Sequence, residues 1–67
     1  MRSATVRQLQ IFSVAASHLS FARAAEKLHL THAAISLQIK QLEDVCGTLL
    51  FDRIGKKVFL TEAGDIL

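Results

Sequence analysis

Two apolar stripes of helical period, separated by a turn of three residues, most constrain how this chain folds. The first stripe has the i, i+3, i+4, i+7 spacing of one helix face and consists of Phe21, Ala24, Ala25 and Leu28. The second follows at steps of four, three and four residues and consists of Ile35, Ile39, Leu42 and Cys46. Ser20 and Thr31 stand where helix N-caps are expected, and Gly47 is a natural C-terminal stop. The pattern predicts a short helix, a turn and a longer helix, which is the helix-turn-helix arrangement.

A further helix is predicted before this pair, from about Val6 to Ser17. Thr5 is followed three residues later by Gln8, which is the capping-box pattern. The residues predicted to form the apolar face of this helix are Leu9, Phe12, Ala16 and Leu19.

After Gly47 the period changes to that of short strands. Residues 50–53 and 57–60 are rich in apolar and β-forming types, with Ile54-Gly55-Lys56 between them, so a two-stranded hairpin is predicted. Thr61 then caps a last helix that begins at Glu62. Fewer than two turns remain before Leu67, and a helix that short is unstable alone. We therefore expect the natural chain to continue.

Composition narrows the functional classes. The chain has 67 residues, 51% of them hydrophobic, which predicts one small domain. No apolar run is long enough to span a membrane, and no secretory signal is recognisable, so no membrane partner is expected. Cys46 is the single cysteine. It has no partner for an internal disulfide, which favours a reduced, cytoplasmic setting and a core position on the second stripe.

The second helix of a helix-turn-helix enters the major groove of DNA with its N-terminal residues. Here the candidate DNA-binding residues at its start and on its outward face are His32, Ala33, Ser36, Leu37 and Lys40. The net charge of +2 says little, but three cations gather within five residues of the hairpin. They are predicted to form a wing on the phosphate backbone or in the minor groove, and they are Arg53, Lys56 and Lys57.

Other chemistries find little support in the sequence. His29 and His32 have the spacing of half a metal site, but three or four ligands are needed, so no metal site is predicted and His29 is interpreted as a turn residue packed on the helices. Ser36 has no base or acid nearby in the pattern, so no catalytic residue or cofactor is predicted and an enzyme is not expected. Leu37 has two open interpretations, a contact to thymine methyls or a stray surface leucine.

The sequence resembles the DNA-binding end of LysR-type transcriptional regulators. The matching segments, with matching spacing, are residues 21–31 (FARAAEKLHLT), 34–36 (AIS), 41–43 (QLE), Gly47, 50–53 (LFDR) and 60–64 (LTEAG). The resemblance implies a mainly α fold with a winged helix-turn-helix DNA-binding domain over residues 1–60. The helix-turn-helix spans about 21–40 and the wing about 50–60. The resemblance also implies DNA-binding roles for Thr31, Ser36, Lys40 and Arg53. Residues 61–67 are implied to be the truncated start of a linker and dimerisation helix.

The same resemblance implies partners and a setting. These are double-stranded DNA with an inverted-repeat operator, a homodimer through the Thr61 helix or a tetramer, and a small-molecule effector bound by a missing C-terminal domain. The expected location is the cytoplasm of a bacterium, at the nucleoid, or a plastid. Residues 7–9, 18–21, 37–43 and 55–61 are more particularly similar to CbbR-type regulators of RuBisCO operons.

The sequence departs from the family at the predicted base-reading positions. The family often has Gln followed by Pro or Ser where this chain has His32 and Ala33, and often Arg where it has Leu37.

The alternative functional class is a winged helix that binds proteins rather than DNA. Lys40 and Arg53 argue against that class, because protein-binding faces favour aromatic anchors over charge.

Overall fold

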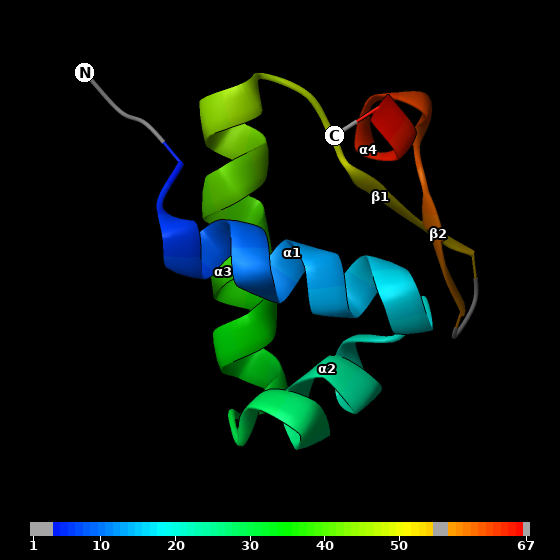
Figure 1. Ribbon diagram of the computed structural model, residues 1–67. Coiled ribbons are helices and arrows are strands. Elements are labelled where there is room, and N and C mark those ends of the chain that lie inside the picture. Colours follow the sequence, from blue (N-terminus) through cyan, green and yellow to red (C-terminus); the bar gives the residue numbers. More distant parts are fainter. Residues whose placement is uncertain (1–3, 55–56, 67) are drawn as a thin grey trace.

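The computed structural model describes residues 4–54 and 57–66, so Gly55 and Lys56 of the predicted hairpin tip lie outside the described residues. Three helices come first, then a two-stranded hairpin and a short helix (Figure 1), which confirms the predicted fold class. Their bounds are α1 (Val6–His18), α2 (Phe21–Leu28), α3 (His32–Cys46), β1 (Phe51–Ile54), β2 (Lys57–Leu60) and α4 (Glu62–Ile66).

The helix boundaries follow from local capping, as the sequence predicts. The side chains of Thr5, Ser20 and Thr31 each accept a hydrogen bond from the backbone N–H three residues later, at 3.0–3.2 Å. At the first of these caps Gln8 completes the box, because its side-chain oxygen accepts from the N–H of Thr5 at 3.1 Å. Gly47 ends α3 with φ 74°, a left-handed conformation that suits glycine.

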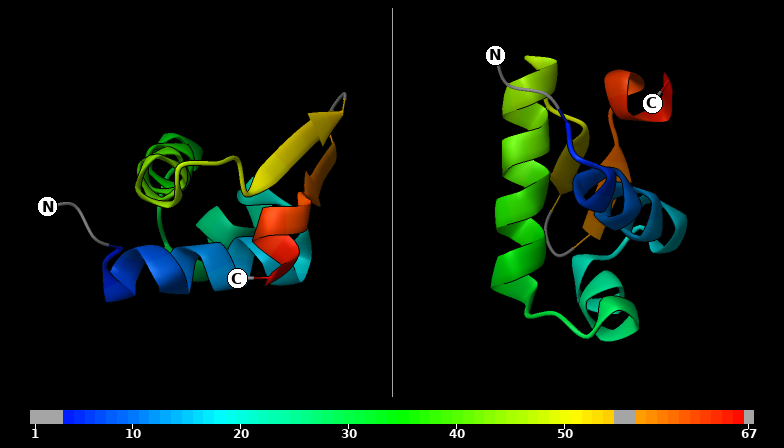
Figure 2. Two further views of the ribbon diagram at one scale, coloured as in Figure 1. Left: turned by 90° about the horizontal axis from the view of Figure 1, so that it is seen from above. Right: turned by 60° about the vertical axis from the view of Figure 1, so that its left-hand side comes forward.

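The three helices pack around one core, with α1 lying across α3 and α2 beside the N-terminal half of α3 (Figure 1). The first two buried residues after α3, Leu50 and Phe51, extend this core to the hairpin. The view from above shows α3 end-on, with the hairpin rising beside it on the same side of α1 (Figure 2, left). The buried apolar residues are Ile11, Phe12, Ala15, Phe21, Ala24, Ala25, Ile35, Ile39, Leu42, Leu50 and Phe51.

The predicted apolar face of α1 is wrong by about one residue. Leu9 and Leu19 are 41% and 44% exposed, and the buried residues of α1 are Gln8, Ile11, Phe12 and Ala15. The helix has apolar residues on most of its sides, so its neighbours rather than its periodicity decide which side is buried. Gln8 tolerates burial because its amide group donates to the side-chain oxygen of Gln41 on α3, at 3.3 Å.

The predicted core position of Cys46 is also wrong, because this thiol is exposed. Leu42 is the last fully buried residue of α3, and residues 46–49 are all exposed. The final turn of α3 therefore extends beyond the elements that pack on the rest of the helix, and the apolar stripe loses its partners there.

The hairpin is antiparallel, with Phe51 opposite Leu60 and Ile54 opposite Lys57. Its base also holds α4. The Thr61 hydroxyl donates to the carbonyl oxygen of Leu49 at 2.6 Å and accepts from the N–H of Gly64 at 3.1 Å. Thr61 is thus the predicted cap of α4 and, in addition, joins that helix to the segment before β1.

Candidate nucleic-acid interface

The outward face of α3 carries the predicted reading residues. His32, Ala33, Leu37 and Lys40 are exposed, and Leu37 has 54% of its surface accessible. Nothing in the described protein covers this face, and the major groove of B-DNA is wide enough to admit a helix. Thr31 lies just before α3, where its hydroxyl oxygen accepts from a backbone N–H and its hydroxyl proton remains free to donate.

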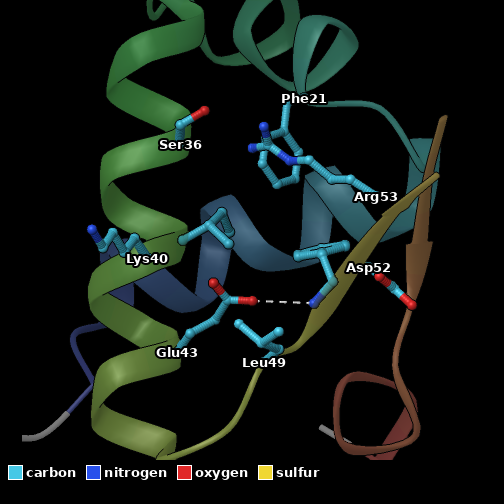
Figure 3. Close-up of a pocket in the computed structure, with 9 residues that line it drawn as sticks. Phe21, Ser36, Lys40, Glu43, Leu49, Asp52 and Arg53 are labelled. Carbon is cyan, nitrogen blue, oxygen red and sulfur yellow. Dashed lines mark hydrogen bonds between the residues drawn. The ribbon is translucent and has the colours of Figure 1, made fainter. Parts of the chain in front are cut away.

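Ser36 is half-buried and does not stand alone on this face. Its hydroxyl lies 3.5 Å from Nδ1 of His32, one turn earlier on the same helix. In the close-up view Ser36 points from α3 toward Phe21 and Arg53, whereas Lys40 points to the other side of the helix (Figure 3). Ser36 and Lys40 therefore face different directions.

A cleft of about 520 Å³ separates α3 from β1. Figure 3 shows this cleft with α1 behind it. Ser36 and Glu43 of α3 lie on one wall and Phe51 and Arg53 of β1 on the other. A helix and a hairpin that flank an open cleft on one side of a domain can engage neighbouring surfaces of a duplex together.

Arg53 is held over an aromatic ring at this cleft. Its guanidinium carbon lies 4.8 Å from the centroid of the Phe21 ring. That ring packs edge-on against Phe51, with centroids 5.2 Å apart, and Phe51 in turn lies 5.3 Å from Phe12. The sequence predicts both a buried Phe21 and a basic Arg53, but no spacing rule relates residues on two different elements.

The role of Glu43 is a second feature that the sequence does not predict, after the contact between Phe21 and Arg53. One of its carboxylate oxygens accepts from the backbone N–H groups of Leu50 and Phe51, at 2.8 and 3.2 Å. This pair of bonds ties α3 to the first residues of the hairpin (Figure 3 shows one of them). The separation of α3 and the wing is thereby fixed by a side chain on the α3 side of the cleft.

The cations predicted for the wing are distributed over both of its faces. Arg53 lies opposite Val58 and Lys57 opposite Ile54, and neighbouring positions along a strand point to opposite sides. Arg53 thus shares the face of Phe51 and of the cleft, and Lys57 belongs to the other face. Both are exposed, and Lys56 lies outside the described residues.

Within residues 4–54 and 57–66, no group of three or more candidate ligands could hold a metal ion. His29 is exposed and caps α2 with φ 56°, so it is the predicted turn residue but does not pack on the helices. None of the helices in that part of the chain is long and apolar enough to cross a bilayer.

The family model for bacterial regulatory helix-turn-helix proteins of the lysR family matches residues 6–65. The chain belongs to the LysR family. It is 57% identical over its whole length to a RuBisCO operon transcriptional regulator of Acidithiobacillus ferrooxidans and to the transcriptional regulator CfxR of Cupriavidus necator. Those matches cover 22% and 21% of the two relatives, so this LysR-family chain spans about a fifth of their length.

A solved structure with the same fold is the CbnR_DBD–DNA complex. It superposes with a TM-score of 0.85 at 35% identity, over 90% of this LysR-family chain and 69% of the CbnR chain. The likeness confirms the predicted winged helix-turn-helix. The relatives named above are transcriptional regulators.

Proposed function

We propose that this chain binds double-stranded DNA sequence-specifically as the DNA-binding domain of a LysR-type transcriptional regulator. In this proposal α3 lies in the major groove and the wing lies on the backbone or in the adjacent minor groove. The observation that carries it is that α3, which has an exposed outward face, and the strand that bears Arg53 flank one open cleft.

The candidate residues divide into three roles in this arrangement. Base edges are read by exposed side chains at the start of α3, where His32 offers ring nitrogens and Leu37 an apolar surface for a thymine methyl. Lys40, Arg53 and Lys57 neutralise phosphates, and Lys56 belongs to the same group by its position in the sequence. Thr31 and Ala33 allow a close backbone approach, since both side chains are small, whereas the hydroxyl of Ser36 bonds to a base edge.

The test is selection of bound duplexes from a random pool, followed by titration of the selected duplex at several salt concentrations. Specific binding predicts an enriched inverted repeat and an affinity that falls steeply with salt, by about 0.9 in log–log slope per neutralised phosphate. Lys40→Ala should reduce that slope by about one unit, and Lys27→Ala, on the exposed side of α2, serves as the matched control. A pool without enrichment and an affinity insensitive to salt would instead favour the protein-binding winged helix.

We also propose that the whole regulator controls carbon-fixation genes, on the strength of its likeness to regulators named for the RuBisCO operon. The helix that begins at Glu62 pairs two subunits on an inverted-repeat operator, in a dimer or tetramer. A C-terminal domain takes a small-molecule effector, and the protein acts in the cytoplasm at the nucleoid. Comparing the selected sequence with promoters of carbon-fixation genes tests the regulatory assignment. Sedimentation of this chain and of a form with an extended α4 tests the pairing, because equal masses and equal affinities would contradict it.

A further inference from the structure

Phe21 occupies an unusual position for a core residue. Only 4% of its surface is exposed, yet one side of its ring supports the Arg53 guanidinium at the cleft, 4.8 Å from its centroid. The close-up shows the Arg53 side chain leaving β1 and crossing toward α3, with its nitrogens over this ring (Figure 3). The ring also lies 6.0 Å from the imidazole of His32, at the start of α3.

The chemistry of this contact suits an arginine that must still bind a ligand. A guanidinium is planar and weakly hydrated, so it stacks on an aromatic face more readily than an ammonium group does. The ring attracts the cation without neutralising its charge, and it uses none of the five N–H donors of the guanidinium. A carboxylate partner would compete with phosphate for both the charge and the donors.

The ring reduces the conformational entropy that Arg53 loses when it binds a ligand. An arginine side chain loses much rotamer freedom when a ligand immobilises it, and orienting it beforehand increases the affinity by that amount. Phe21 is well suited to this because its own ring is held edge-on by Phe51. The platform is therefore rigid, although Arg53 itself is exposed.

We propose that Phe21 is a positioning residue for DNA binding, whose ring orients the Arg53 guanidinium across the cleft before the duplex arrives. This inference rests on the proposed function and identifies a residue that raises the affinity for DNA through Arg53, without contacting DNA itself. A cation–π contact at an exposed site corresponds to a change of about two- to fivefold in an equilibrium constant, so the expected effect on DNA affinity has that size.

The experiment is a double-mutant cycle in the full chain, measured with the selected duplex at one salt concentration and a temperature at which every variant is folded. Phe21→Leu removes the platform, Arg53→Met removes the cation, and the double variant removes both. Phe12→Leu is the matched control, because Phe12 also packs on Phe51 and is 7% exposed, whereas it is the ring of Phe21 that lies under the Arg53 guanidinium. Affinities are expressed per folded molecule, which separates binding from lost stability.

We expect Phe21→Leu to weaken binding two- to fivefold more than Phe12→Leu, and to have no effect when Arg53 is already methionine. Equal effects of the two leucine variants, or a deficit that persists beside Arg53→Met, would overturn the proposal. If Arg53→Met binds as the wild type does, Arg53 makes no DNA contact and the platform role is wrong while DNA binding stands. If the wild type itself selects no duplex, the proposed function fails.

A measurement on the unmodified chain covers the case in which Phe21→Leu does not fold. A guanidinium over the face of a phenyl ring lies in its ring current, so the NMR signals of the Arg53 side-chain protons should be shifted upfield relative to those of Arg23, an exposed arginine on α2. Signals at the same positions as those of Arg23 would show that no platform exists in solution.

Discussion

Replacing Glu43 should separate the wing from α3 and lower the stability of the whole domain. Its carboxylate accepts the N–H groups of Leu50 and Phe51 at 2.8 and 3.2 Å, both through one oxygen. Leu50 is only 1% exposed, so water cannot easily replace the lost acceptor at its backbone. No other side chain joins α3 directly to the start of β1 among the hydrogen bonds of the described residues.

The magnitude follows from the two bonds. A hydrogen bond to a charged acceptor contributes about 1.5–3 kcal/mol, and Glu43 is half-buried, so the lower end applies to each bond. Glu43→Ala should thus cost about 3 kcal/mol in the free energy of unfolding. Because so small a core supplies only about 3–5 kcal/mol in total, this variant should be close to unfolded. Glu43→Gln keeps one oxygen that can accept both N–H groups at neutral strength, so its expected cost is about 1–2 kcal/mol.

Urea unfolding followed by circular dichroism measures both effects. Asp44→Asn is the matched control, since Asp44 is the exposed neighbour on the same helix and its replacement should stay within about 0.5 kcal/mol of the wild type. The m-value should be unchanged for Glu43→Gln, because the same surface is exposed on unfolding. A Glu43→Gln midpoint equal to that of Asp44→Asn would refute the assignment of Glu43 as the tie between α3 and the wing.

Three further outcomes are expected. Gly64→Ala should lower the free energy of unfolding by about 1–3 kcal/mol, since a Cβ there would overlap a backbone carbonyl. Urea unfolding should show that Asn is tolerated better at Gly47 than at Gly64, because φ at Gly47 is 74° and the space around it is open. Ile39→Ala should lose about 2–5 kcal/mol of stability, whereas Ser36→Ala should keep its melting temperature and lose about 1–3 kcal/mol of specific binding; a destabilised Ser36→Ala with normal affinity would contradict this. Lys57→Ala should lower the salt slope of DNA binding by about 0.9, and an unchanged slope would place Lys57 in solvent.

The features that the sequence predicts correctly are local ones. The sequence predicts Thr5, Ser20 and Thr31 as caps, because a hydroxyl three residues before a free N–H can bond to it within one turn. The structure contains each of these bonds. The sequence predicts that Gly47 ends α3 for an equally local reason, because glycine readily adopts a left-handed conformation. Such interactions depend on neighbours in the chain, so one sequence is enough to infer them.

The features that the sequence does not reveal depend on contacts between elements. The register of α1 is set by which of its apolar sides meets α3, and by the pairing of Gln8 with a glutamine 33 residues away. The exposure of Cys46 depends on how far the other elements extend along α3. Glu43 resembles any polar helix residue until the start of β1 folds back beside it.

The contacts that Glu43 and Phe21 make at the cleft also explain how the departures from the family pattern can be tolerated. Glu43 and Phe21 lie in segments that match the family, and they hold the wing and α3 in a fixed relation through backbone N–H groups and an aromatic ring. His32, Ala33 and Leu37, which differ from the common family residues, are all exposed. Because exposed side chains contribute little to folding, these three positions can change without moving the frame that presents them. In the proposed interface, the same frame can therefore present a different set of side chains to the bases from the first turns of α3.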